Sequence, residues 1–131
     1  MAKTRNLDRN AIAQRANDAR AHLKAAELFA DEPDAASWKV AGSNAAIAGI
    51  AAADAICGRV LGYCSASDSH ADAIKLLERA TRPNTAPANN LQRLLNDTSL
   101  FQYGASRVTH AHAQGLVKHA RRLIESMDAL L

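Results

Sequence analysis

Apolar residues recur along the chain with the spacing of an α-helix. In residues 7–30 they return every three or four positions, which places them along one face of a helix. This first set consists of Ile12, Ala16, Ala19, Leu23 and Ala26. The same spacing reappears near the C-terminus, at Ala113, Leu116, Val117, Ala120, Leu123, Ile124 and Met127. Both ends of the chain are therefore predicted to be amphipathic helices.

Residues 38–61 form a longer and more uniformly apolar segment. Its larger residues, with Asn44 and Asp54 among them, are expected on one side, while glycine and alanine occupy most other positions. Small side chains allow neighbouring helices to approach closely. We therefore expect a second helix here, and we expect it to be the central and most buried one.

Turn-forming sequences divide the rest of the chain. The stretches DEPD at 31–34, GYCSASDS at 62–69 and RPNTAP at 82–87 contain the Gly, Pro, Asp and Ser residues that are typical of loops. Between the last two stretches the sequence predicts a third helix, at 70–82. A fourth helix is expected after them, with an apolar face made of Leu91, Leu94, Leu95 and Phe101.

Residues that favour helix N-caps precede four of the expected helices. They are Ser37, Ser67 or Asp68, Thr85 and Ser106. Five amphipathic helices with short connections predict an all-α fold, an antiparallel up-and-down four-helix bundle with one extra short helix. The chain, residues 1–131, is long enough for one such domain.

Composition agrees with a helical domain and suggests a cellular setting. Hydrophobic residues make up 48% of the chain but aromatic residues only 4%, so the apolar residues are mostly helix formers. No apolar run follows the charged N-terminus, and the most apolar window, 45–57, is too short to span a bilayer. Cys57 and Cys64 match no metal or redox motif. We therefore expect a cytoplasmic protein that uses no membrane, metal or cofactor.

The segment SRVTHAHAQ, residues 106–114, contains candidates for catalysis. Arg107 and His112 have the Arg-x4-His spacing of one group of metal-independent ribonucleases, and His110 lies between them. Successive helical residues turn by about 100°, so His110 and His112 point roughly 200° apart and cannot share a metal ion. Arg107 and His112 lie roughly 140° apart, and they converge only if the helix begins near Thr109 or a second chain completes the site. If Ser106 is the cap, both histidines are instead expected to be half-buried beside the apolar face.

Cations are expected on the outward side of the same helix. They are Arg107, Lys118, Arg121 and Arg122. An ordinary solvated surface explains them without a ligand. The net charge of +3 also permits a phosphate-binding stripe. Both interpretations stay open.

Asp54 is predicted to lie on the apolar face of the second helix, where a carboxylate needs a partner. His70 shares a face with Ile74 and Leu77, so it is expected to point inward from the start of the third helix. We expect Asp54 to contact His70, with the Tyr103 hydroxyl nearby. This buried polar cluster would either fix the register of the helices or form a pocket with a shifted histidine pKa.

Three strings together resemble a bacterial HEPN-like domain. They are AGIAAADAI at 48–56, SDSHADAIKLL at 67–77 and FQYG at 101–104, and an amphipathic C-terminal helix follows them. The resemblance implies an antiparallel helical bundle, often a homodimer. It also implies a superfamily of ribonucleases, toxin-antitoxin components, and RNA- or nucleotide-binding modules that have lost activity.

The catalytic signature of that superfamily matches this chain in part. RVTHAH has the required spacing from Arg107 to His112 but has Val108 where a polar residue is usual, and QYG resembles branches that lack the catalytic pair. We therefore expect a binding or interaction module for RNA or a nucleotide. The alternatives are a toxin-like ribonuclease that uses Arg107 and a histidine, and a purely structural dimerisation or toxin-antitoxin partner protein.

Overall fold

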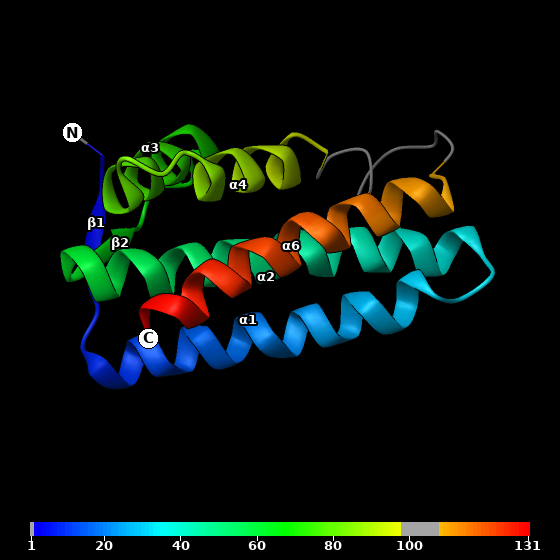
Figure 1. Cartoon of the computed structure of the whole chain (residues 1–131), viewed down its shortest axis with the longest axis horizontal. Coiled ribbons are helices and arrows are strands. Elements are labelled where there is room, and N and C mark those ends of the chain that lie inside the picture. Colours follow the sequence, from blue (N-terminus) through cyan, green and yellow to red (C-terminus); the bar gives the residue numbers. More distant parts are fainter. Residues whose placement is uncertain (1, 98–107) are drawn as a thin grey trace.

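The structure is a computed structural model, and it describes residues 2–97 and 108–131. These residues form five helices and a small sheet (Figure 1). The helices are α1 (Arg9–Ala30), α2 (Ala35–Leu61), α3 (His70–Thr81), α4 (Ala86–Asn96) and α6 (His110–Leu130), and the strands are β1 (Thr4–Asn6) and β2 (Tyr63–Ser65). The predicted helical class is confirmed, whereas the sheet was not predicted.

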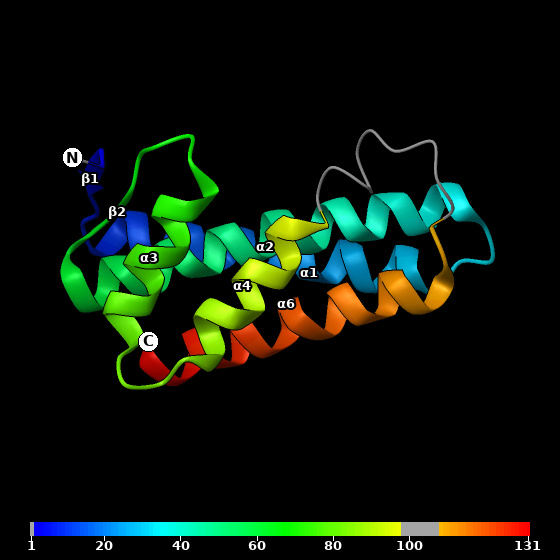
Figure 2. The same cartoon turned by 90° about the horizontal axis from the view of Figure 1, so that it is seen from above.

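Helix α2 is the centre of the molecule, as the small residues indicated. It packs against α1, α3, α4 and α6. Helix α1 runs antiparallel to α2, α6 lies beside both of them, and α3 and α4 cover a further side (Figures 1 and 2). Alanines such as Ala45 and Ala52 are completely buried, but Val40 and Ile47, which were expected on the inner face, are each 39% exposed. Small residues therefore form most of the contacts of α2, together with the completely buried Ile56, because small side chains allow neighbours to approach on several sides.

Gly58 shows how close this approach is. A Cβ atom added there would lie 2.9 Å from Cγ1 of Ile12 and 2.9 Å from Cδ1 of Leu7. The residues that lead into α1 thus pass directly over the backbone of α2. Glycine at this position lets the N-terminal segment reach the sheet.

The length of α2 corrects one expectation from the sequence. The helix has 27 residues, and its best 18-residue window has a mean hydropathy of 1.4, so by length and composition it could cross a membrane. The window at 45–57, which was judged too short to span a bilayer, therefore underestimated the length of the apolar helix. However, 67% of that 18-residue window is buried inside the molecule, which is also the property of a core helix surrounded by other helices.

The two strands tie the N-terminus to the end of α2. They are antiparallel, with Arg5 opposite Cys64 in the register. Gly62 ends α2 with a left-handed φ of 85°, a conformation that favours glycine. The chain can then turn at once into β2, within the segment that the sequence indicated as a loop.

Four of the helices begin at a side-chain N-cap, although not always the predicted one. The caps are Asp8, Asp34, Ser69 and Thr109, and each accepts a hydrogen bond from a backbone N–H three residues later. They replace the expected caps Ser37, Ser67 or Asp68, and Ser106. Thr85 precedes α4 as predicted, but its side chain makes no capping bond.

Candidate functional site

Helix α6 begins late, at His110. The Thr109 side chain caps it and accepts a hydrogen bond from the His112 N–H at 3.1 Å. The prediction that Ser106 caps this helix was therefore wrong, and the start near Thr109 is the one that the ribonuclease interpretation requires. Arg107 lies outside the described residues.

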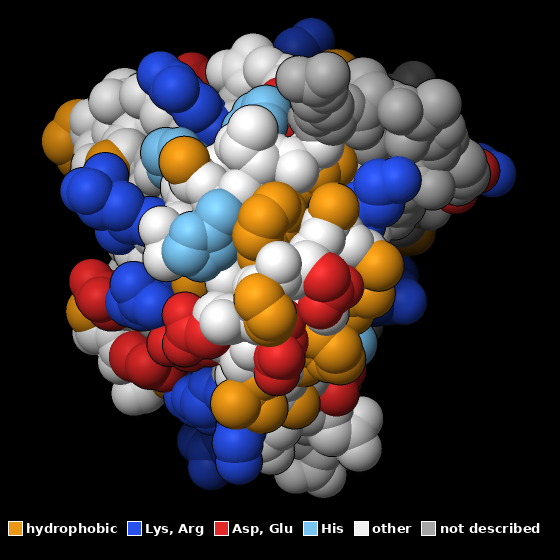
Figure 3. All heavy atoms as spheres, turned by 90° about the vertical axis from the view of Figure 1, so that its right-hand side faces the viewer, with side chains coloured by type: hydrophobic (Ala, Val, Ile, Leu, Met, Phe, Trp, Pro, Cys, Tyr) orange, Lys and Arg blue, Asp and Glu red, His pale blue; other side chains and the backbone are white. Residues whose placement is uncertain are grey.

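The two histidines of this segment have different neighbours. His112 Nε2 lies 3.6 Å from Asp97 Oδ2 at the end of α4, while the His110 ring packs against Trp38 with centroids 5.4 Å apart. Both histidines are exposed rather than half-buried. Figure 3 shows histidine side chains at the surface of this end of the molecule, beside hydrophobic ones. Within residues 2–97 and 108–131, no group of three potential metal ligands is present.

A cationic face is formed where α4 packs against α6. His119 Nδ1 on α6 lies 3.0 Å from Asn90 Oδ1 on α4. Burial lowers the pKa of His119, and the positive charges of Arg93, Arg122 and Lys118 lower it further, against a weaker opposite effect of Asp97. We call Arg93, Lys118 and Arg122, together with His119, the α4–α6 cationic face.

The three permanent cations of this face are not neutralised by carboxylates. Among the described residues, Arg93, Lys118 and Arg122 form no ion pair. Mutual repulsion among cations costs free energy that an anion would offset. This arrangement therefore favours a bound anion more than an ordinary surface with interspersed charges does.

Arg121 differs from its predicted companions. It donates a hydrogen bond to Glu27 Oε2 at 3.0 Å and so connects α6 to α1. Together with Lys118 and Asp31 these residues line a hollow of about 250 Å³. The residues predicted to bind phosphate therefore do not act as one group. Lys118 and Arg122 keep their charges available for a ligand, whereas Arg121 is paired with Glu27.

The sequence pattern missed Arg93 and His119. Each belongs to a predicted helix, but the pattern along one helix does not show which other helix lies beside it. The apolar face of α4, with buried Leu91 and Leu94, indicated only which side of α4 turns toward a neighbour. The packing of α4 on α6 is what brings Arg93 near His119.

Asp54 has arginine partners instead of the predicted histidine. Arg15 Nη2 lies 2.9 Å and Arg15 Nε 3.2 Å from Asp54 Oδ2, and Arg5 Nη2 lies 3.9 Å from the same oxygen. Burial raises the pKa of Asp54, although the charges of Arg15 and Arg5 act to lower it. The expected contact with His70 was wrong, because His70 is the first residue of α3 and is exposed there. Tyr103 lies outside the described residues.

The surroundings of Asp54 fit a structural role better than a pocket. Cys57 and Cys64 are buried free thiols. Burial, with the charge of Asp54, raises the pKa of Cys57 to about 12 and also raises that of Cys64, so both stay protonated and unreactive at neutral pH. The adjoining cavity measures about 20 Å³, which holds no more than about one water molecule.

No known protein family and no curated protein matches the chain. Its function is therefore inferred from the geometry described above.

Proposed function

We propose that this protein is a small helical module that binds RNA or a nucleotide through the phosphates. The observation that carries the proposal is the α4–α6 cationic face, where Arg93, Lys118 and Arg122 gather around His119 without carboxylate partners among the described residues. Lysine and arginine contacts to phosphates supply most of the affinity in nonspecific nucleic-acid binding. Cations spread over two packed helices can contact successive phosphates of one strand.

The directions of four helices support a HEPN-like bundle. In Figure 1, α1, α2, α4 and α6 alternate in direction along the chain, while α3, which is about as long as α4, lies beside it. We propose on this basis an up-and-down four-helix bundle with one extra helix. A cytoplasmic homodimer belongs to the same proposal, and the exposed side chains of Leu28, Phe29 and Val40 offer an apolar surface for a protein contact.

Fluorescence anisotropy with a single-stranded RNA tests the binding function. The variant Lys118→Glu/Arg122→Glu is compared with Arg9→Glu/Lys24→Glu, which makes the same charge change on α1. We expect the α6 variant to bind much more weakly and to lower the slope of log K against log salt by about 1.4, since each phosphate contact contributes about 0.7 for single strands. Equal losses in both variants would contradict the proposal.

The same measurement addresses the structural alternative. A protein that acts only through apolar contacts with a partner chain should bind no RNA at low salt, and its association should respond little to salt. The phosphate-binding module should instead bind at low salt and lose affinity steeply at moderate salt.

A second candidate function is metal-independent RNA cleavage. The late start of α6 and the 3.6 Å separation of His112 Nε2 from Asp97 Oδ2 favour it. A carboxylate beside an imidazole can hold the ring in one orientation, as a general base requires. In this mechanism His112, or His110, removes the proton of the attacking 2′-hydroxyl, and Arg107 stabilises the pentacoordinate phosphate. The bond from phosphorus to the 5′ oxygen then breaks, and that oxygen takes a proton from the imidazolium or from water.

Cleavage of a labelled RNA in the presence of EDTA tests this second function. We expect His112→Ala to abolish cleavage and Asp97→Asn to reduce it, whereas His70→Ala, a change at an exposed histidine of α3, leaves it unchanged. Cleavage that survives both His112→Ala and His110→Ala would remove the enzymatic function and leave the binding function untouched.

A further inference from the structure

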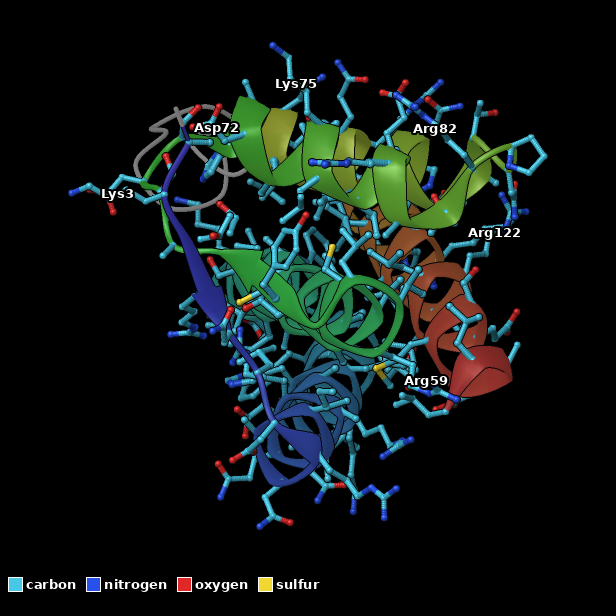
Figure 4. The ribbon with its side chains drawn as sticks, turned by 90° about the vertical axis from the view of Figure 1, so that its left-hand side faces the viewer. Lys3, Arg59, Asp72, Lys75, Arg82 and Arg122 are labelled. Carbon is cyan, nitrogen blue, oxygen red and sulfur yellow. The ribbon has the colours of Figure 1, made fainter. Side chains whose placement is uncertain are left out.

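A second set of cations lines a cleft beside α3, away from the α4–α6 cationic face. The cleft has a volume of about 330 Å³ and lies between the two-stranded sheet and α3. Figure 4 shows Lys3 just before β1, Lys75 on α3 and Arg82 just after the end of α3 at this end of the molecule. The lining residues used below are Lys3, Thr4, Ser65, Asp72, Lys75, Glu78, Arg79 and Arg82.

The cations of the cleft come from two elements. Lys75, Arg79 and Arg82 are four and three residues apart, the spacing that places them on one face of a helix. Lys3 reaches the same cleft from the sheet. Among the described residues, none of these four side chains forms an ion pair, so their charges remain available to a ligand.

The two carboxylates in the lining do not cancel these charges. Asp72 already accepts a hydrogen bond from Ser67 Oγ at 2.8 Å. It also lies in the first turn of α3, where the helix dipole stabilises a negative charge. Glu78 adds a second negative charge, so the cations exceed the carboxylates by two.

Hydroxyl groups supply further donors. Ser65 Oγ accepts a hydrogen bond from the Ser67 N–H at 3.3 Å, which leaves its own proton free to donate to a ligand. Thr4 places a second hydroxyl in the lining. Ammonium, guanidinium and hydroxyl donors together match a group that only accepts hydrogen bonds and carries several negative charges.

We propose that this cleft binds a diphosphate group, either as free pyrophosphate or as part of a nucleotide or an RNA 5′ end. Its volume is near the lower end of the range for small-ligand sites, about 300–1,000 Å³. The described lining contains no aromatic side chain on which a base could stack. The diphosphate is therefore the recognised group and the base contributes little. This site is separate from the α4–α6 cationic face and goes beyond the function proposed above.

Isothermal titration calorimetry of the whole chain tests the site. The probes are inorganic pyrophosphate and ADP, and the variant Lys75→Ala/Arg79→Ala is compared with Arg9→Ala/Lys24→Ala, which removes two cations from α1. We expect pyrophosphate and ADP to bind with similar affinity, and we expect the α3 variant to bind about tenfold more weakly for each cation lost, as a change of about 1.4 kcal/mol per contact gives. The α1 variant should bind as the unchanged protein does.

Three results would overturn the proposal. The first is the absence of pyrophosphate binding, and the second is an equal loss of pyrophosphate affinity in the α1 control variant. The third is ADP binding more than tenfold tighter than pyrophosphate, which would indicate that the base is recognised. An RNA with a 5′ triphosphate, compared with the same RNA bearing a 5′ hydroxyl, distinguishes an RNA end from a free nucleotide as the source. The variant Lys118→Glu/Arg122→Glu should still bind pyrophosphate in this cleft. The cleft and the α4–α6 cationic face can therefore be tested independently of each other.

Discussion

Arg15 on α1 donates two hydrogen bonds to the carboxylate of Asp54 on α2, at 2.9 and 3.2 Å. The Asp54 side chain is only 13% exposed and that of Arg15 is 25% exposed. Arg5 approaches the same carboxylate from β1. One half-buried carboxylate thus joins two helices and the sheet, and it gives the N-terminal half of the chain a specific polar contact.

The pair should be energetically coupled. We expect Arg15→Ala and Asp54→Ala to show a coupling of about 1–3 kcal/mol in a double-mutant cycle measured by urea unfolding, as is found for contacting charged residues. The matched cycle uses His70→Ala, which should be additive with Asp54→Ala because His70 is exposed. Coupling of Asp54 to His70 but not to Arg15 would reverse the assignment made here.

Loss of Arg15 should make stability depend more strongly on pH. Burial already raises the Asp54 pKa, and Arg15 acts to lower it, so Arg15→Ala should raise this pKa further. A carboxyl whose folded pKa is above its unfolded value, about 3.9, destabilises the fold progressively as the pH rises from that value through the folded pKa. The loss of unfolding free energy in Arg15→Ala should therefore be larger at pH 7 than at pH 4. In the background Asp54→Asn, the loss caused by Arg15→Ala should change much less with pH, because only the exposed partner Asp18 then remains.

The spacing of apolar residues was sufficient to locate the helices, because each one buries a continuous face. It could not reveal the sheet. The strands β1 and β2 have three residues each and come from distant parts of the chain, so neither carries an alternating pattern long enough to detect. The start of α6 was misplaced because Ser106 and Thr109 are both good caps, and local sequence does not choose between them.

The polar contacts were harder to predict than the helices. The sequence indicated that Asp54 needs a partner, and this was correct. The sequence did not indicate that this partner is Arg15. Arg15 directly precedes Ala16 and so lies at the edge of the apolar face of α1. From there its long side chain can reach inward to Asp54. Arg93 likewise lies near His119 only because α4 packs against α6, and the sequence pattern of one helix does not show which helix is its neighbour.

Two glycines should respond oppositely to the same substitution. Gly115→Ala on α6 should increase stability by about 0.5–1 kcal/mol. Among the described residues, no atom outside the adjoining part of α6 lies within 4 Å of the added Cβ, and alanine favours a helix. Gly58→Ala on α2 should decrease it by about 1–3 kcal/mol, because the added Cβ meets Leu7 Cβ at 3.2 Å as well as the side-chain ends of Leu7 and Ile12. Thermal and urea unfolding measure both. Stabilisation by Gly58→Ala would show that α1 and β1 can move away from α2.

The start of α6 can be tested by its cap. Thr109→Ala should lower the free energy of unfolding by about 1 kcal/mol, because it removes the bond to the His112 N–H. Ser106→Ala is the matched control and should have little effect. A larger loss for Ser106→Ala would mean that the helix begins earlier, and it would also weaken the ribonuclease alternative, which needs the late start.

His119 should take up a proton when RNA binds. Burial and the charges of Arg93, Arg122 and Lys118 lower its pKa, so in the free protein the ring is mostly neutral at pH 7. Phosphates placed on the α4–α6 cationic face would offset these positive charges, and the pKa of His119 should then rise. RNA affinity should consequently increase as the pH falls from about 8 to about 6, near the ordinary histidine pKa.

NMR titration of the His119 ring, with and without saturating RNA, measures this shift directly. His119→Gln keeps a polar side chain opposite Asn90 and should bind RNA with an affinity that depends less on pH. A His119 pKa that does not change when RNA binds would place the phosphates elsewhere on the surface, even if the protein does bind RNA. Because Asp97 acts on His119 in the opposite sense, Asp97→Asn should lower the free-state pKa of His119.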